Sequence, residues 1–120
     1  MVYEILNHPD LRALDVVAVL DALSNPLRLE AVRQIAAGSA LTCGSVLPGV
    51  SKSTASHHWR VLRESGVLHQ ERVGRTVIMS LRENDLDTRF PGLLKAILSA
   101  TGPERLDDVR KLNRGDDGPA

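Results

Sequence analysis

Residues 51–81 read SKSTASHHWRVLRESGVLHQERVGRTVIMSL, and this stretch decides the fold. It begins with small polar, histidine and basic positions at helical spacing and stops at Gly66. Two strand-like runs follow, Val67–Val73 and Thr76–Leu81, with a turn at Gly74-Arg75 between them. A helix followed by such a hairpin predicts a winged helix-turn-helix, in which the helix enters the DNA major groove and the hairpin reaches the neighbouring phosphates.

The predicted helix has two different faces. Ser51 is its expected N-cap, and Trp59 and Leu62 fall on the side that faces the core. The two adjacent histidines separate on the helical wheel, with His57 on the outward face and His58 at the margin of the core. This separation favours a DNA contact for His57 and a packed flank position for His58, rather than joint metal binding.

Charge is distributed unevenly along a chain whose formal net charge is zero. Residues 41–82 hold six Lys or Arg against two acidic residues, a net charge of +4. Residues 1–40 hold three against five, and residues 83–120 hold six against eight, so each flanking region carries −2. The positive excess therefore lies in the predicted DNA-reading segment, as expected for binding to a polyanion.

Length and composition indicate one small intracellular domain. A chain of 120 residues with one Trp, one Tyr and one Phe must build its core from Leu, Val, Ile and Ala. Charged residues interrupt every apolar run, which predicts no membrane span, and the acidic N-terminal region is unlike a signal peptide. The single cysteine excludes an intramolecular disulfide and suits a reducing compartment. We expect a cytoplasmic protein.

Helices are expected on both sides of the DNA-reading segment. Upstream, residues 11–23 are apolar nearly all round, and a helix at 26–37 follows the capping signal Ser24-Asn25-Pro26, with Leu27, Ala31, Val32 and Ile35 on one stripe. A short segment is expected at 42–47, with Thr42 as its N-cap. Downstream, residues 90–98 have the spacing of an amphipathic helix, with Pro91 near its start. The folded domain is predicted to span residues 11–100, and the charged stretch 103–120 to be a flexible tail.

Three motifs resemble the ArsR/SmtB family of small dimeric bacterial repressors. They are LSNPLRLEAV at 23–32, SKSTASHHWRVLRESGV at 51–67 and ERVGRTVIMSL at 71–81, and the resemblance extends over roughly residues 14–100. It implies a winged-helix core, flanking helices that build a twofold dimer, and release from an operator by an effector. The segment 42–51 is about two residues shorter than the family pattern, and Trp59 stands where the family usually has leucine.

A homodimer is also expected from the apolar ends, because two such helices expose more apolar surface than a small core can cover. A twofold dimer places two recognition helices about one DNA turn apart, which predicts a near-palindromic operator in double-stranded DNA. The alternative is that both helices pack entirely within their own protomer. The residues expected at the dimer interface are Leu14, Val17, Leu20, Phe90, Leu94 and Ile97.

The residues expected to contact DNA carry short hydrogen-bonding groups or positive charge. Short donors and acceptors on the helix suit base edges and nearby phosphates, and the basic residues neutralise the DNA backbone. Arginines on the hairpin reach a flanking minor groove or phosphate. These residues are Lys52, Ser53, Thr54, Ser56, His57 and Arg60 on the helix, and Arg72 and Arg75 on the hairpin.

The sequence defines the effector-sensing site less clearly than the residues expected to contact DNA. By the resemblance, metal-sensing members carry paired cysteines before the recognition helix, or His, Asp and Glu ligands in the last helix. This chain has only Cys43 in the first region and no histidine in the last helix. One thiol does not complete a tetrahedral metal site, although His8 or a second protomer would add ligands. No cofactor is assigned, and Cys43 is either a small buried residue or a redox-sensitive sensor.

Two other classes of function remain as alternatives. A winged helix can serve as a protein-interaction module without sequence-specific DNA binding, and genome-wide recovery of bound DNA would separate this from a regulator. An enzyme is disfavoured, because the chain has no glycine-rich phosphate loop and no nucleophile–base arrangement.

Overall fold

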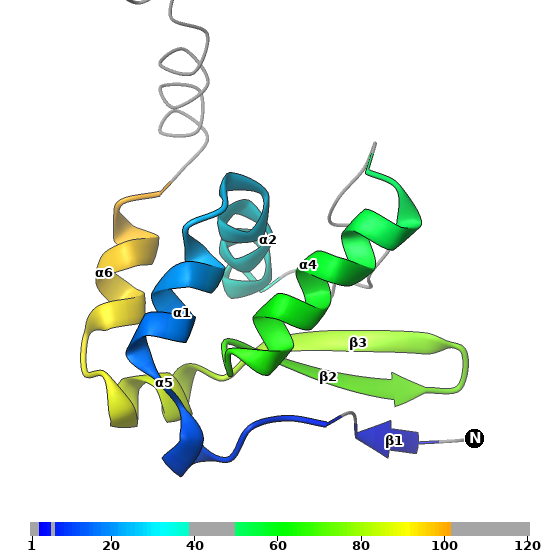
Figure 1. The fold of residues 1–120 in the computed structure, drawn as a ribbon, viewed down its shortest axis with the longest axis horizontal. Coiled ribbons are helices and arrows are strands. Elements are labelled where there is room, and N and C mark those ends of the chain that lie inside the picture. Colours follow the sequence, from blue (N-terminus) through cyan, green and yellow to red (C-terminus); the bar gives the residue numbers. More distant parts are fainter. Residues whose placement is uncertain (1–2, 6, 39–49, 102–120) are drawn as a thin grey trace, which may run out of the picture.

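The computed structural model describes residues 3–5, 7–38 and 50–101 (Figure 1). Within these residues, five α-helices and the β2–β3 hairpin form the predicted winged helix-turn-helix, so the fold class is confirmed. The expected segment at 42–47 and the expected tail at 103–120 lie outside the described residues. In chain order the elements are β1 (Tyr3–Ile5), the 3-10 helix η1 (Leu11–Ala13), α1 (Val16–Leu23), α2 (Pro26–Ala36), α4 (Lys52–Glu64), β2 (Leu68–Val73), β3 (Thr76–Leu81), α5 (Glu83–Arg89) and α6 (Leu93–Ser99).

The wing is part of a three-stranded antiparallel sheet, in the order β1-β2-β3. The predicted hairpin is present, with Leu68 opposite Leu81 and Val73 opposite Thr76. The strand β1 was not expected from the sequence. It pairs with the end of β2 nearest the turn, where Tyr3 lies opposite Val73. The N-terminal strand therefore lies along the free edge of the wing (Figure 1).

The N-terminal helix is shorter than expected. Residues 11–23 do not form one helix, because Leu14 is extended and separates η1 from α1. Asp15 caps α1 by accepting from the backbone N–H groups of Val17 and Ala18, both at 3.4 Å. The carbonyl of Leu14 accepts instead from Arg89 Nη2 at 2.8 Å. A capping carboxylate and a distant arginine thus mark the start of α1, at a point that apolar periodicity does not reveal.

The predicted start of α2 is confirmed. Asn25 Oδ1 accepts from the N–H groups of Leu27 at 2.9 Å and Arg28 at 3.2 Å, and Pro26 occupies the first turn. Ala31, Val32 and Ile35 are buried as expected. Leu27 is 42% exposed, which corrects its predicted place on the buried stripe. A residue in the first turn of this helix lies too close to the molecular surface to be covered.

The C-terminal region also differs from the expected single helix. Phe90 is the C-cap of α5, and α6 begins only at Leu93. Pro91 and Gly92 separate the two short helices. Gly92 has a φ of +79°, a backbone conformation that glycine adopts without steric cost. Phe90 and Leu94 still pack, partly buried, against the core, so the apolar periodicity identified core-facing residues, although the helix expected at 90–98 begins only at Leu93 and α5 was not expected.

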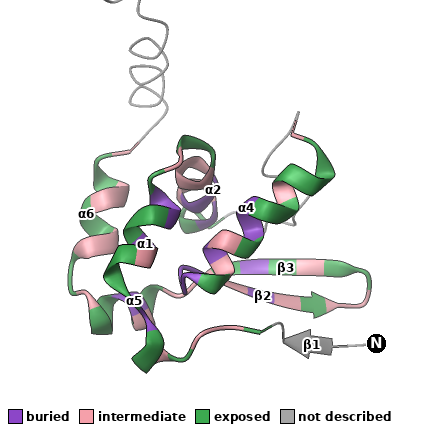
Figure 2. Cartoon of the chain, in the orientation of Figure 1, coloured by how far each residue is buried: buried purple, intermediate pink, exposed green. Residues whose placement is uncertain are grey.

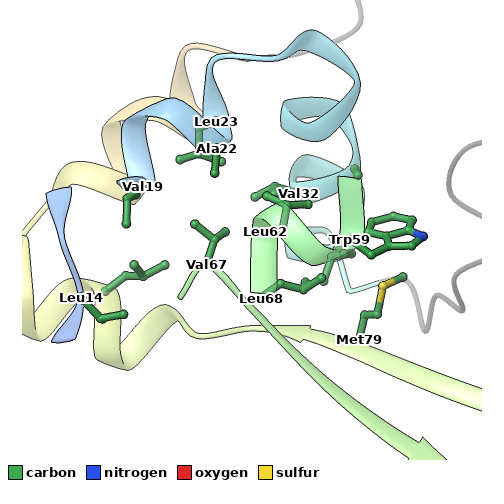
Figure 3. Close-up of a cluster of buried hydrophobic side chains, with 13 residues drawn as sticks. Leu14, Val19, Ala22, Leu23, Val32, Trp59, Leu62, Val67, Leu68 and Met79 are labelled. Carbon is green, nitrogen blue, oxygen red and sulfur yellow. The ribbon is translucent and has the colours of Figure 1, made fainter. Parts of the chain in front are cut away.

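The core lies between the helices and the root of the wing (Figure 3). Leu62 and Trp59 of α4 meet side chains of α1, α2 and the sheet, and the side chain of Met79 on β3 points toward Trp59. All core residues except Trp59 are aliphatic or Met, as the composition predicted. The buried core consists of Leu14, Val19, Ala22, Leu23, Ala31, Val32, Ile35, Trp59, Leu62, Val67, Leu68, Met79 and Leu86.

Gly66 connects α4 to the wing at a crowded position. Its φ is +89°, and a Cβ placed there would overlap Leu14 Cδ2. The glycine predicted to end the helix is therefore required both by backbone conformation and by space. Within the described residues, no helix has the length and hydropathy needed to cross a bilayer.

Candidate nucleic-acid interface

The outer face of α4 is polar and positively charged. Ser51 caps the helix, with its hydroxyl accepting from the Thr54 N–H at 3.2 Å. Trp59 and Leu62 point into the core, so the helix offers only its other side to solvent (Figure 2). The residues predicted on this helix to contact DNA are all exposed: Lys52, Ser53, Thr54, Ser56, His57 and Arg60.

Two of these hydroxyl groups also organise the first turn of α4. Ser51 Oγ donates to Thr54 Oγ1 at 2.8 Å and lies 3.4 Å from Ser53 Oγ. The Ser53 and Thr54 hydroxyls therefore contact the capping hydroxyl of Ser51, and both residues remain exposed at the N-terminal end of the helix. The N-terminal end of a helix carries partial positive charge, which suits a nearby DNA phosphate.

The wing brings the other two predicted residues to the surface. Arg72 lies on β2 opposite Val77, and Arg75 lies in the turn beside Gly74, whose φ is +63°. Both arginine side chains are exposed. The turn that the sequence predicted at Gly74-Arg75 is thus present, and it places a guanidinium group at the end of the hairpin.

The adjacent histidines occupy different environments, as expected. His57 is exposed, whereas His58 is buried, and their ring centroids lie 5.8 Å apart. Arg28 Nη1 donates to His58 Nδ1 at 3.2 Å. Burial lowers the pKa of His58, and the nearby charges of Arg28 and then His57 lower it further. His58 is therefore a neutral, packed residue at neutral pH.

The inner side of α4 is joined to the wing by a buried polar contact. Arg63 Nη1 donates to Gln70 Oε1 at 2.8 Å, and Gln70 is buried. This arginine belongs to the basic segment in sequence but points toward the sheet instead of the exposed outer face of α4. The buried nitrogens Trp59 Nε1 and Arg63 Nε have no hydrogen-bond partner among the described residues. Trp59 is a core residue, as predicted.

The remaining histidines tie the N-terminal segment to the wing. His8 and His69 stack with ring centroids 4.5 Å apart, and His8 Nε2 accepts from the Gln70 N–H at 2.9 Å. His69 Nε2 is 2.7 Å from Glu71 Oε1. The sequence placed His69 in the DNA-reading half but did not pair it with His8, because no local pattern links residues so far apart.

No cluster of three or more His, Cys, Asp or Glu residues able to hold a metal occurs among residues 3–5, 7–38 and 50–101. Cys43, the candidate sensor, lies outside the described residues. A surface cavity of about 530 Å³ lies between α5 and α6 and is lined by Glu83, Asp87 and Lys95, with other residues of both helices.

The residues predicted at a dimer interface divide into two groups. Val17 and Leu20 on α1 are 67% and 45% exposed, and so are available to a partner. Leu14 is only 2% exposed and packs within its own protomer, which corrects its assignment to the interface. Its extended backbone turns the side chain toward Gly66. The other three, Phe90, Leu94 and Ile97, are partly buried against the core.

One residue of this region was missed by the sequence analysis. Arg28 stands in the motif LSNPLRLEAV, where only the apolar positions and the cap were interpreted. Its guanidinium contacts the end of α1 as well as His58. An arginine in the first turn of a helix is unfavourable to the helix dipole, and this local mismatch was the available signal.

Comparison with known proteins centres on the same part of the chain. Residues 23–71, from the end of α1 into β2, match the family described as "Helix-turn-helix domain". The chain is 37% identical over 82 residues to the uncharacterized HTH-type transcriptional regulator YceK of Bacillus subtilis (strain 168), a match covering 66% of this chain and 82% of YceK. It is also similar to the crystal structure of the transcriptional repressor BigR from Xylella fastidiosa, with 30% identity, a TM-score of 0.50, and coverage of 62% of this chain and 85% of BigR. Both are regulators of transcription rather than enzymes.

Proposed function

Because the chain belongs to the helix-turn-helix transcriptional regulators, we propose that it is a homodimeric, ArsR/SmtB-type repressor of a near-palindromic operator. The observation that carries this proposal is the polar, basic outer face of α4 beside a wing with two exposed arginines. Binding to chromosomal DNA accords with the cytoplasmic location expected from the sequence.

In this proposal α4 enters the major groove. Ser53, Ser56 and His57 present short hydrogen-bonding groups toward base edges, and Thr54 lies beside them at the capped end of the helix. Charged side chains serve a different purpose, because they neutralise phosphates and fix the register of the helix without reading sequence. Lys52 and Arg60 on α4, and Arg72 and Arg75 on the wing, have this role.

The homodimer would form through α1 and the C-terminal helices. Val17 and Leu20 are exposed apolar side chains on one helix, and Leu94 and Ile97 of α6 are only partly covered by the core. Covering them with a second copy removes apolar surface from water. A twofold arrangement would place two α4 helices about one turn of DNA apart, roughly 34 Å, which requires an operator with two related half-sites.

Repression and release are supported by two different observations. BigR, which this chain resembles, is a transcriptional repressor. The resemblance to ArsR/SmtB proteins suggests that an effector releases the operator, and Cys43 is the candidate residue for sensing it. Operator release measured across metals and oxidants, with Cys43→Ser as the control, would identify the class of effector.

Selection from random DNA and recovery of bound genomic fragments test the central proposal. We expect a near-palindromic consensus whose affinity falls steeply with salt, because phosphate contacts release counterions. The double variant His57→Ala/Arg60→Ala should lose specific binding while keeping the helical circular dichroism of the unmodified protein. Arg12→Ala/Lys95→Ala is the matched control, since both side chains are exposed on other elements.

Two results would overturn the proposal. If the His57→Ala/Arg60→Ala variant binds the selected DNA normally, α4 is not the reading element. If no sequence preference emerges at all, the protein-interaction module becomes the better interpretation of the same fold.

A further inference from the structure

Arg28 is a junction between three helices. It stands in the first turn of α2, and its Nε donates to the Ala22 carbonyl at 2.7 Å. Its Nη2 lies 3.4 Å from the Asp21 carbonyl, and its Nη1 donates to His58 Nδ1 at 3.2 Å. One guanidinium group therefore contacts the last turn of α1 and the middle of α4 at the same time.

The contact with α1 is well suited to an arginine. The last carbonyl groups of a helix lack intrahelical partners and carry partial negative charge. A guanidinium group has a planar, rigid set of donors, so it can bond the Ala22 carbonyl and still direct a third N–H elsewhere. Its second donor lies beside the Asp21 carbonyl, which also accepts from the Ser24 N–H at 3.2 Å and from Ser24 Oγ at 2.6 Å. Because the donors move together, the position of α1 determines where Nη1 points.

The contact with α4 depends on a neutral His58. Arginine has only donors, so His58 Nδ1 must accept the hydrogen bond and the ring proton must lie on Nε2. A protonated ring would have no acceptor at Nδ1 and would place a positive charge against the guanidinium. The charged groups that act on His58 are Arg28 from α2 and His57 on its own helix, and α1 contributes the two carbonyls held by Arg28.

The location of this contact connects the two proposed surfaces. Helix α1 carries the exposed Val17 and Leu20, and α4 carries the DNA face. The other contacts described between these helices come from apolar core packing, which has little directional preference. A hydrogen bond to one ring nitrogen is directional, and it constrains the rotation of α4 about its axis. That rotation determines which side chains face a groove.

We propose that Arg28 and His58 are positioning residues for DNA recognition, and that acidification weakens operator binding by breaking the hydrogen bond between them. This inference rests on the proposed function. It adds a built-in pH dependence that arises away from the proposed DNA-contacting face of α4.

The test measures operator affinity by fluorescence anisotropy from pH 5.0 to pH 8.0, using DNA selected with the unmodified protein. His58→Asn keeps an oxygen acceptor near the position of Nδ1 and does not titrate, and His and Asn have similar helix propensities. His58→Leu keeps the bulk of the side chain and removes the acceptor. Both variants retain His57, and their affinities are compared with that of the unmodified protein as ratios at each pH.

At pH 7.5 we expect His58→Asn to bind the operator with an affinity within about twofold of that of the unmodified protein. At pH 5.0 we expect it to bind about tenfold more tightly than the unmodified protein, because the loss of one hydrogen bond to a charged group changes affinity by about that factor. His58→Leu should bind about tenfold more weakly than the unmodified protein at pH 7.5. Arg28→Lys should resemble His58→Leu, because an ammonium group cannot satisfy three separated acceptors.

Circular dichroism on the same samples separates positioning from folding. The inference is overturned if specific binding occurs but the ratio between His58→Asn and the unmodified protein stays constant with pH, or if affinity losses match the fraction unfolded. Long-range ¹H–¹⁵N spectra of the DNA-free protein give a second readout, because they report which ring nitrogen carries the proton. A proton on Nδ1 of His58 at pH 7.5 would overturn the inference without affecting the proposed function. Absence of specific binding by the unmodified protein would overturn both.

Discussion

Helices α4 and α1 pack on the same core but present opposite chemistry to solvent. The exposed residues of α4 are polar or charged, with Lys52 and Arg60 against the single acidic residue Glu64 at its end, whereas α1 exposes Val17 and Leu20. Contact with a polyanion such as DNA is favourable for positively charged side chains, and removal from water is favourable for apolar surface. Each helix therefore uses one face for the core and is left with a second face suited to a different partner. The contrast supports separate surfaces for DNA and for a second protomer.

The largest expected effect comes from the apolar side of this comparison. Val17→Asp/Leu20→Asp should convert the proposed dimer to a monomer, because charge would have to be buried at the interface. A monomer has one α4 helix instead of two, so operator affinity should fall about 100-fold or more. Sedimentation equilibrium and anisotropy would measure both changes.

Ile78→Asp is the matched control for oligomeric state. Ile78 is 47% exposed, close to the 45% of Leu20, but it lies on β3. It should leave the dimer intact. A Val17→Asp/Leu20→Asp variant that remains dimeric and binds the operator normally would remove α1 from the interface.

A second change tests the contact between Gly66, in the DNA-reading half, and Leu14, in the N-terminal segment. Gly66→Ala must adopt a positive φ and would overlap Leu14, so we expect a loss of about 2–4 kcal/mol in the free energy of unfolding. Gly38→Ala has a similar φ of +90° but would meet no atom of the described residues within 4 Å, and should cost about 1 kcal/mol. Urea unfolding measures both. Equal losses would show that the contact with Leu14 contributes little.

The charged side of the comparison predicts smaller, sequence-independent effects. Arg72→Ala and Arg75→Ala should each weaken binding several-fold on specific and nonspecific DNA alike, and each should reduce the slope of log affinity against log salt by about one. Arg12→Ala, on η1, is the matched control and should change neither. A variant that altered the selected consensus instead would indicate that the wing reads bases.

The smallest expected effect concerns the stability of the unbound protein. Because the pKa of His58 is lower in the folded state than its ordinary value of 6.5, the unfolded state binds more protons at acid pH. The stability associated with neutral His58 is therefore complete above about pH 6.5 and is lost as the pH falls toward the lowered pKa. The difference in free energy of unfolding between the unmodified protein and His58→Asn should shrink or reverse from pH 7.5 to pH 5.5. A difference in the free energy of unfolding that stays constant between pH 7.5 and pH 5.5 would contradict this expectation.

The DNA-reading half was predicted well because its signals are local. Ser51 and Gly66 mark the ends of α4, and the 3.6-residue period alone separates His57 from His58 and buries Trp59. The turn at Gly74-Arg75 likewise follows from adjacent residues. In these cases the interacting groups lie within a few positions of one another along the chain.

The flanking regions were predicted less well because distant residues determine them. Arg89 donates to the Leu14 carbonyl just before the start of α1, whereas apolar spacing had extended this helix back to residue 11. The edge of β2 accepts the strand Tyr3–Ile5, although nothing in those three residues specifies that pairing. The link from Arg28 to His58 likewise joins residues 30 positions apart.

The sequence by itself determined the winged helix-turn-helix, the exposed basic face of α4 and the wing with its arginines, since caps, glycines and periodicity act over a single turn or hairpin. Only the tertiary structure decided that Leu14 belongs to the core, that β1 completes the sheet, and that Arg28 holds His58. These outcomes depend on which carbonyls, edges and cavities the packed chain brings together. Local propensity contains no information about such neighbours.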